Sequence, residues 1–194
     1  MTHKFDPANI GRLDNSKRRA ILPPEIVLAD IQLRNTDVWA DIGCGVGYFS
    51  IPMAGNLKKV YSLDISDEML TELKRRFSEQ HIDNVEALLS EENAIPLPDK
   101  SVDGVLLALA AHELDNPNLF FRQITRILKP GGRLVVIEWV KAVMDMGPPL
   151  DHRLEPEQVD SWAEVVQLTK GRSWQWSGAF AGLEYIKGID MEAN

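Results

Sequence analysis

The run from Val38 to Tyr48 constrains the fold of this chain more than any other segment. Apolar strand residues and an acid come first, and glycine then occupies every second position at Gly43, Gly45 and Gly47. A strand that enters a glycine turn and then a helix is typical of α/β domains whose turn presents backbone N–H groups to a ligand. Glycine suits such a turn because it adopts positive φ and lets a ligand approach where a Cβ would clash. An ordinary strand-to-helix turn has the same appearance. The neighbouring residues therefore have to show whether this turn binds a ligand.

Two classes of cofactor are bound at turns of this kind. A dinucleotide turn has the spacing Gly-x-Gly-x-x-Gly, and its third glycine lets the helix pack closely below a diphosphate. Tyr48 stands where that third glycine would be. The Asp41 carboxylate would also repel a diphosphate, whereas it would form a charge-assisted hydrogen bond with an ammonium group. The turn therefore favours S-adenosylmethionine, whose amino-acid tail carries an ammonium group and no phosphate, over NAD.

A second acid ends the next apolar segment, Val60 to Asp64. In nucleotide-binding α/β domains, an acid roughly 20 residues past the glycines accepts hydrogen bonds from the ribose hydroxyls. An acid before a helix also stabilises the helix dipole, and this simpler role explains Asp67 and Glu68. We interpret Asp64 as the ribose ligand because it is paired with the glycine turn.

The most apolar stretch, Val102 to Ala111, predicts a central parallel strand that is buried on both faces. It leads directly into His112 and Glu113. Ligands of open α/β sheets lie beyond the carboxyl ends of the strands, so both side chains are expected at the mouth of the site. A histidine there can take a proton from a nucleophile near pH 7, or it can order the loop and pack against the cofactor. His112 is therefore a candidate for both roles, and Glu113 is the second candidate base.

From about residue 36 to 140 the chain resembles the class I S-adenosylmethionine-dependent methyltransferases. Within that class it is most similar to the ubiquinone and menaquinone C-methyltransferases, which have a type 11 methyltransferase domain. Four segments carry the resemblance: ADIGCGVGYFS, VYSLDISDEML, SEENAIPLPDKSVDGVLLALAAHEL and ILKPGGRLVVIEW. The resemblance implies an α/β, Rossmann-like fold, with a seven-stranded, mostly parallel sheet and helices on both faces.

The resemblance also implies S-adenosyl-L-methionine as the cofactor and an acid-containing pair beside its adenine. That pair falls on Glu91 and Glu92, and either of them could face the adenine amino group. The family commonly has Gly-Asp-Ala where this chain has Ser90-Glu91-Glu92. The full set expected at the cofactor is Asp41, Gly43, Cys44, Gly45, Gly47, Asp64, Ile65, Met69, Glu91, Glu92, Ala108 and His112.

The predicted reaction is transfer of a methyl group to a small-molecule acceptor that the sequence does not identify. Direct displacement at a sulfonium methyl depends mainly on holding the reacting atoms in line, so no catalytic triad is required. Two alternatives stay open. One is a nicotinamide-dependent oxidoreductase on a Rossmann-like fold, and the other is a protein that binds S-adenosylmethionine without transferring its methyl group.

Charge and composition exclude several other classes. The net charge of −8 argues against a nucleic-acid partner, and the one tight basic run, Lys17-Arg18-Arg19, is interpreted as a solvated helix face. Cys44 is the only cysteine and the four histidines lack ligand spacing, so neither a disulfide nor a metal is expected. The chain shows no signal peptide and no apolar stretch as long as a membrane span. We expect a cytoplasmic enzyme, for which a homodimer is plausible.

The ends of the chain are expected to frame the site. Residues 1–35 are predicted to form an N-terminal helical lid, and residues 36–194 the methyltransferase domain. In the enzymes that this chain resembles, such an extension covers the cofactor, for which Phe5, Asp6 and Pro7 are candidates; a disordered terminus is the alternative. A helix is predicted to begin at Pro23-Pro24.

The segment after Trp139 is predicted to border the substrate opening. It starts with a methionine-rich stretch, Lys141 to Leu154, and continues with a helix over Pro156 to Thr169. Two short antiparallel strands at the sheet edge are expected to close the fold, over Arg172 to Trp176 and Ala181 to Ile186.

Overall fold

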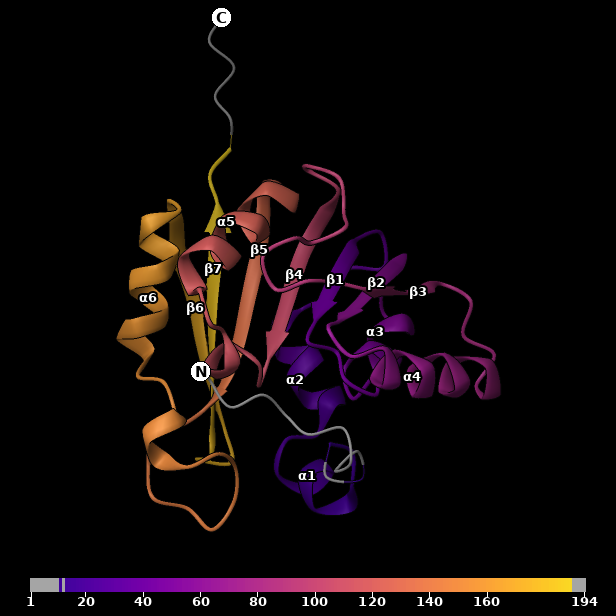
Figure 1. Cartoon of the computed structure of the whole chain (residues 1–194), viewed down its shortest axis with the longest axis horizontal. Helices are drawn as coiled ribbons and strands as arrows, with labels where there is room; N and C mark the ends of the chain where they lie inside the picture. Colours follow the sequence, from indigo (N-terminus) through magenta and orange to yellow (C-terminus); the bar gives the residue numbers. More distant parts are fainter. Residues whose placement is uncertain (1–10, 12, 190–194) are drawn as a thin grey trace, which may run out of the picture.

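One sheet organises the part of the chain that the computed structural model describes, residue 11 and residues 13–189 (Figure 1). Its strands are β1 (Val38–Ile42), β2 (Lys59–Asp64), β3 (Val85–Leu89), β4 (Val102–Ala108), β5 (Leu128–Trp139), β6 (Leu168–Trp176) and β7 (Phe180–Lys187). They lie in the order β3-β2-β1-β4-β5-β7-β6. Strand β7 runs antiparallel to β5 and β6, and the other neighbours are parallel. The predicted seven-stranded, mostly parallel sheet is confirmed.

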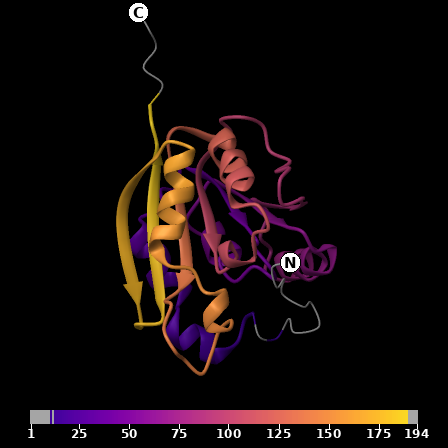
Figure 2. The same ribbon diagram turned by 60° about the vertical axis from the view of Figure 1, so that its left-hand side comes forward.

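Helices cover both faces of the sheet, as predicted. They are α1 (Ser16–Ile21), α2 (Pro24–Ile31), α3 (Ser50–Ala54), α4 (Asp67–Glu79), α5 (Pro117–Ile127) and α6 (Pro156–Val165), with the short 3-10 helices η2 (Ala111–Glu113) and η3 (Leu150–His152). Helices α5 and α6 pack into one core cluster with Ala40, and Figure 2 shows them on the same side. Helices α2 and α3 pack into another cluster with Trp39. Because successive strand residues point to opposite faces, the two clusters lie on opposite sides of β1.

Two glycines in the strands make room for tryptophan side chains. Trp39 on β1 is in register with Gly104 on β4, where a Cβ would lie 2.2 Å from the indole ring. Trp176 on β6 covers Gly182 on β7, where a Cβ would lie 2.6 Å from the ring. The glycines are therefore part of tight packing between strands.

Two predicted boundaries are wrong because the backbone turns earlier than the hydrophobic pattern suggests. The strand expected over Val102 to Ala111 ends at Ala108, since Leu109 adopts a φ of 58°. The helix expected over Pro156 to Thr169 ends at Val165, since Gln167 adopts a φ of 59° and leads into β6. The helix predicted at Pro23-Pro24 begins at Pro24.

The C-terminal hairpin is antiparallel, as predicted, but its strands are longer than expected. Strands β6 and β7 have 9 and 8 residues, and β7 lies inside the sheet between β5 and β6. Of these two strands, only β6 lies at an edge of the sheet. None of the helices in the described ranges has the length and hydropathy that crossing a membrane would require.

A buried carboxylate fixes the hairpin to the rest of the fold. Glu184 on β7 is 3% exposed and pairs with Arg133 on β5 at 2.9 Å and with Arg172 on β6 at 3.0 Å. Both guanidinium groups also donate to the Ile31 carbonyl at the end of α2. Burial favours the protonated acid, but the hydrogen bonds from both arginines outweigh burial and lower the pKa of Glu184 to about 2.

Replacing Glu184 tests this network. The change Glu184→Gln is expected to lower the free energy of unfolding by about 2 kcal/mol at pH 7, less than for a fully enclosed pair because the arginine side chains are partly exposed. Since the folded-state pKa lies below the unfolded value, the loss should be present above pH 4.5 and vanish as the pH falls towards 2. Urea unfolding of both proteins between pH 3 and 7 measures it. A similar loss in Glu86→Gln, which removes an exposed pair with Lys59, would contradict the assignment.

Candidate functional site

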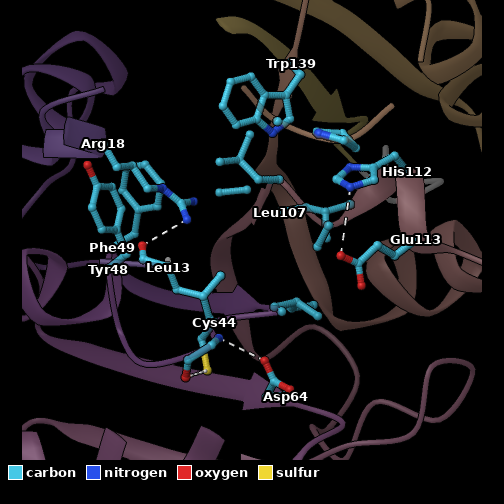
Figure 3. A pocket seen from close by; sticks show the side chains of 18 of the residues that line it. Leu13, Arg18, Cys44, Tyr48, Phe49, Asp64, Leu107, His112, Glu113 and Trp139 are labelled. Carbon is cyan, nitrogen blue, oxygen red and sulfur yellow. Dashed lines mark hydrogen bonds and ion pairs between the residues drawn. The ribbon is translucent and has the colours of Figure 1, made fainter. Parts of the chain in front are cut away.

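A cavity of about 1200 Å³ opens at the carboxyl ends of the parallel strands (Figure 3). Its floor is formed by the glycine turn after β1 and by the ends of β2 and β4. The loop after β3, the 3-10 helix η2, the segment around α1 and the segment after β5 form its walls. It therefore lies where the sequence places the site, and two segments outside the central sheet help to enclose it.

The glycine turn needs glycine for both backbone conformation and space. Gly43, Gly45 and Gly47 have φ values of 69°, 52° and 89°. A Cβ on Gly43 would lie 2.8 Å from the Ala110 side chain, and one on Gly47 would lie 2.4 Å from Leu73. The turn thus packs against both the loop after β4 and helix α4.

The N–H groups of the turn are used within the protein, which corrects the expectation that they face a ligand. Gly43 and Cys44 donate to the Leu63 carbonyl at 2.8 and 3.0 Å. Gly45 donates to Asp64 Oδ2 at 2.8 Å, and Gly47 donates to the Cys44 carbonyl at 3.0 Å. A diphosphate would find none of these four donors free.

Asp64 connects the turn to the next strand. One of its oxygens accepts from Gly45, and the other accepts from the Ser66 backbone N–H at 2.9 Å. Burial raises the pKa of the Asp64 carboxyl above its ordinary value, although these backbone hydrogen bonds oppose the shift. The carboxylate lines the cavity, where its remaining acceptor capacity faces the space above the turn (Figure 3).

Asp41 lies beneath the turn and is 2% exposed. Ser50 Oγ donates to its Oδ2 at 2.5 Å, and Ser62 Oγ donates to Ser50 at 2.8 Å. Burial raises the pKa of Asp41 to about 7; the Ser50 hydrogen bond opposes the shift and the charge of Asp64 adds to it. Asp41 is thus a lining group whose charge changes near neutral pH.

The structure separates the two glutamates after β3. Glu92 lines the cavity together with Ser90, while Glu91 is exposed outside it. One Glu92 oxygen accepts from the backbone N–H groups of Asp115 and Asn116 at 2.8 and 2.9 Å. Of the predicted pair, Glu92 is therefore the one that lines the cavity.

The other predicted site residues are largely brought together. Besides those described, the cavity is lined by Ile65, Met69, Ala108, His112 and Glu113. Gly47 lies behind the lining and serves the shape of the turn. Among the described residues, no group of three or more histidine, cysteine or acidic side chains is placed to hold a metal ion.

His112 has a partner that the sequence analysis missed. Its Nδ1 lies 3.0 Å from both carboxylate oxygens of Glu138 at the end of β5, and Glu138 is 7% exposed. The pairing follows from the parallel register, because β4 and β5 are neighbours and Ala108 pairs with Ile137. An acid at the end of the adjacent strand was the available signal.

The segment before α2 closes one side of the cavity. Tyr48, at the position of a third dinucleotide glycine, donates its hydroxyl to the Leu22 carbonyl at 2.6 Å. Asp14 pairs with Arg76 on α4 at 2.9 Å and with Arg19 at 2.7 Å. The predicted lid residues Phe5, Asp6 and Pro7 lie outside the described residues.

Lys17 and Arg19 are exposed, as expected for a solvated helix face, but Arg18 of the same basic run is not. It lines the cavity, its Nη1 donates to the Leu13 carbonyl at 2.9 Å, and its guanidinium carbon lies 4.6 Å from the centre of the Tyr48 ring. Its Nε is buried without a hydrogen-bond partner. Within residues 13–189, no carboxylate forms an ion pair with this cation. It is available to an anionic group of a ligand.

The methionine-rich segment closes the opposite side. Arg153, which is 3% exposed, donates to the carbonyls of Val140, Ala142, Met146 and Pro148 at 2.6 to 3.2 Å. These bonds hold the loop beside Trp139, and most of its residues line the cavity. The expectation that this segment borders the opening agrees with its position.

Comparisons with known proteins agree with this geometry. A family model described as a methyltransferase domain matches residues 40–136. An uncharacterized methyltransferase-like protein of Schizosaccharomyces pombe is 29% identical over 157 residues, which are 76% of this chain and 53% of that protein. A demethylmenaquinone methyltransferase of Listeria monocytogenes is 33% identical over 101 residues, 50% of this chain and 43% of that protein. The chain thus spans about half the length of these curated relatives.

A solved structure covers more of the chain. The S-adenosylmethionine-dependent methyltransferase of Aquifex aeolicus is 32% identical, with a TM-score of 0.89 over 94% of this chain and 99% of that one. The family model, this likeness and the cavity on the glycine turn lead to one conclusion. The chain belongs to the methyltransferase domain family and has the fold of the class I S-adenosylmethionine-dependent methyltransferases.

Proposed function

We propose that this protein transfers the methyl group of S-adenosylmethionine to a small molecule bound in the same cavity. The observation that carries the proposal is that three features line the same cavity. These are an acid-lined glycine turn that uses four of its N–H groups within the protein, an arginine that forms no ion pair with a described carboxylate, and a histidine whose ring is oriented by a buried carboxylate. The diphosphate of a nicotinamide dinucleotide would have to compete for the N–H groups of Gly43, Cys44, Gly45 and Gly47, which already donate to acceptors within the protein.

The cavity residues fit the cofactor group by group. Glu92 and Ser90 would lie beside the adenine, with Ile65 and Met69 as apolar neighbours, and Asp64 would accept from the ribose hydroxyls. The ammonium would be neutralised by Asp41, and the carboxylate by Arg18. Each charged group of the amino-acid tail thus has an opposite charge within the lining.

The protein would contribute to the reaction by positioning the cofactor and the acceptor and by enclosing them in the cavity. The cofactor supplies an electrophilic methyl group when bound. The glycine turn and the loop after β4 would hold it against the acceptor, since in-line placement lowers the barrier most effectively. His112, with Glu113 as the neighbouring acid, would face the acceptor and receive its proton.

The N-terminal residues 1–35 are proposed to act as a lid, and 36–194 as the transferase domain. Of the described part, Leu13, Asn15, Lys17, Arg18 and Ile21 line the cavity. Helix α2 instead packs in the core beside Trp39. Within the proposed lid, the described residues before α2 would cover the cavity, held by Tyr48 and Asp14, while α2 would anchor the lid to the core. A homodimer and a cytoplasmic location stay predictions.

Calorimetry and labelled methyl transfer test the proposal directly. S-adenosylhomocysteine should bind, NADH should not, and a tritiated methyl group should move from the cofactor to a compound in a metabolite extract. Binding of NADH alone would overturn the assignment. Binding of S-adenosylhomocysteine without any labelled product would favour a protein that binds the cofactor without transferring its methyl group.

The role of Arg18 gives a specific prediction. The change Arg18→Ala should weaken binding of S-adenosylhomocysteine by roughly 10- to 100-fold, because a charged hydrogen bond contributes about 1.5–3 kcal/mol. Methylthioadenosine, which lacks the amino-acid tail, should bind the variant and the native protein equally well. Arg122→Ala, which removes an exposed arginine on α5, is the control. Equal losses for both ligands would show that Arg18 shapes the cavity instead.

The raised pKa of Asp41 predicts a pH dependence of cofactor binding. Below pH 7 the carboxyl binds a proton that the ammonium must displace, so affinity should fall as the pH falls, approaching tenfold per unit. Calorimetry with S-adenosylhomocysteine between pH 5.5 and 8.5 measures this. Because His112 also titrates, Asp41→Asn serves as the control and should remove most of the slope. An unchanged slope in that variant would contradict the role of Asp41.

A further inference from the structure

Among the described residues, the His112 ring has hydrogen-bond partners at Nδ1 only. Both oxygens of Glu138 lie 3.0 Å from Nδ1, and Glu138 also accepts from the backbone N–H groups of His112 and Trp139 at 3.2 Å each. Backbone donors of η2 and of the end of β5 therefore hold the carboxylate beside the imidazole. In contrast, Nε2 has no hydrogen bond to any of the described residues, and Glu113 is its nearest carboxylate at 3.8 Å.

This arrangement selects one tautomer of the neutral ring. A carboxylate accepts hydrogen bonds, so the imidazole proton belongs on Nδ1, and the lone pair stays on Nε2. Nδ1 points to the sheet, and His112 and Glu113 both line the cavity (Figure 3). A neutral histidine held in this way presents a basic nitrogen to the ligand.

We propose that Glu138 is a positioning residue that keeps His112 in this tautomer, an inference that rests on the proposed function. The Nε2 atom then removes the proton from a hydroxyl group of the acceptor. The hydroxyl oxygen forms a bond to the methyl carbon while the carbon–sulfur bond breaks. The electron pair of the broken bond stays on sulfur. The proton moves from the hydroxyl to Nε2. The products are a methyl ether, S-adenosylhomocysteine and an imidazolium that later releases its proton to water.

The surrounding charges favour a neutral hydroxyl acceptor. Two carboxylates, Glu138 and Glu113, lie within 4 Å of the imidazole ring and disfavour a second anion there. An amine that is neutral at the working pH attacks with its own lone pair, so a preorganised base would add little to its reaction. A hydroxyl gains most because it is a weak nucleophile until its proton is removed.

The walls beside His112 define the body of such an acceptor. Trp139, Met144, Met146 and Leu150 line the same cavity and provide apolar surface, while Arg153 is occupied by backbone carbonyls. Methionine side chains adapt to flat or irregular shapes. The acceptor class that fits is an uncharged, largely apolar compound with a phenolic or similar hydroxyl.

The contacts of His112 also predict how the rate depends on pH. Burial disfavours the imidazolium, but the hydrogen bond and charge of Glu138, with the charge of Glu113, outweigh burial and the opposing charge of Arg153. The pKa of His112 therefore lies above its ordinary value. A base must be unprotonated, so the rate should rise with pH through this pKa and level off above it.

Nuclear magnetic resonance of the imidazole nitrogens tests the proposal without an acceptor. In native protein with S-adenosylhomocysteine bound, neutral His112 should carry its proton on Nδ1, and Glu138→Gln should lower the pKa of His112 by about 1–3 units. Glu113→Gln is the matched control and should lower the pKa less while keeping the tautomer. A proton on Nε2, or an unchanged pKa in Glu138→Gln, would overturn the proposal.

The linkage in the labelled product tests the acceptor class. After methyl transfer to a metabolite extract, the tritium should be found on oxygen, and the rising limb of the pH–rate profile should shift to lower pH in Glu138→Gln. A merely structural loss would reduce the rate without moving that limb. Tritium on nitrogen or sulfur would overturn the hydroxyl assignment. The absence of any labelled product would instead contradict the proposed function, while the resonance measurement would still decide the role of Glu138.

Discussion

The hydrogen bond from the Gly45 N–H to the Asp64 carboxylate is the interaction on which the site depends. With the bonds from Gly43 and Cys44 to the Leu63 carbonyl, it ties the glycine turn to the end of β2. The turn consequently satisfies its donors within the protein and offers a carboxylate to the cavity. That is the opposite of a phosphate cradle, which offers N–H groups and positive potential. A nucleoside with hydroxyl groups and a zwitterionic tail suits such a floor.

The cavity becomes an enclosed site through two segments that the sheet alone would not bring together. The segment before α2 is held beside the cavity by the Tyr48 hydroxyl and by the Asp14–Arg76 pair. The segment after β5 is held by the four carbonyls that Arg153 collects. Tyr48 thus has two roles. Its bulk is incompatible with a dinucleotide turn, and its hydroxyl anchors the segment before α2. Figure 1 shows α1 and the loop after β5 on the same end of the sheet.

Much of the fold and of the cavity lining could be predicted from the sequence, because the signals are local. Strand residues, glycines and terminal acids follow one another from Val38 to Asp64, and their spacing determines what meets at the strand ends. Boundaries were missed where a non-glycine residue turns the chain, as at Leu109 and Gln167. Those turns depend on tertiary packing that a hydrophobic pattern does not record.

The roles of Arg18 and Glu138 could not be predicted because they depend on contacts between distant segments. Arg18 looks like part of an exposed basic run until Tyr48 and Leu13 enclose it. Glu138 is an acid at the end of a strand, which was the one available signal, but its role depends on the neighbouring His112, which the strand register brings to it. The same holds for Glu91 and Glu92, since the turn after β3 determines that only Glu92 of the two lines the cavity.

A crystal structure of the protein with bound S-adenosylhomocysteine tests the central claim most directly. The account predicts the ribose on Asp64, the adenine beside Glu92 and the carboxylate paired with Arg18, with sulfur on the side of the cavity that His112 faces. The N–H groups of Gly43, Cys44 and Gly45 should keep their partners within the protein. A turn that opens and donates these N–H groups to the ligand would contradict the account.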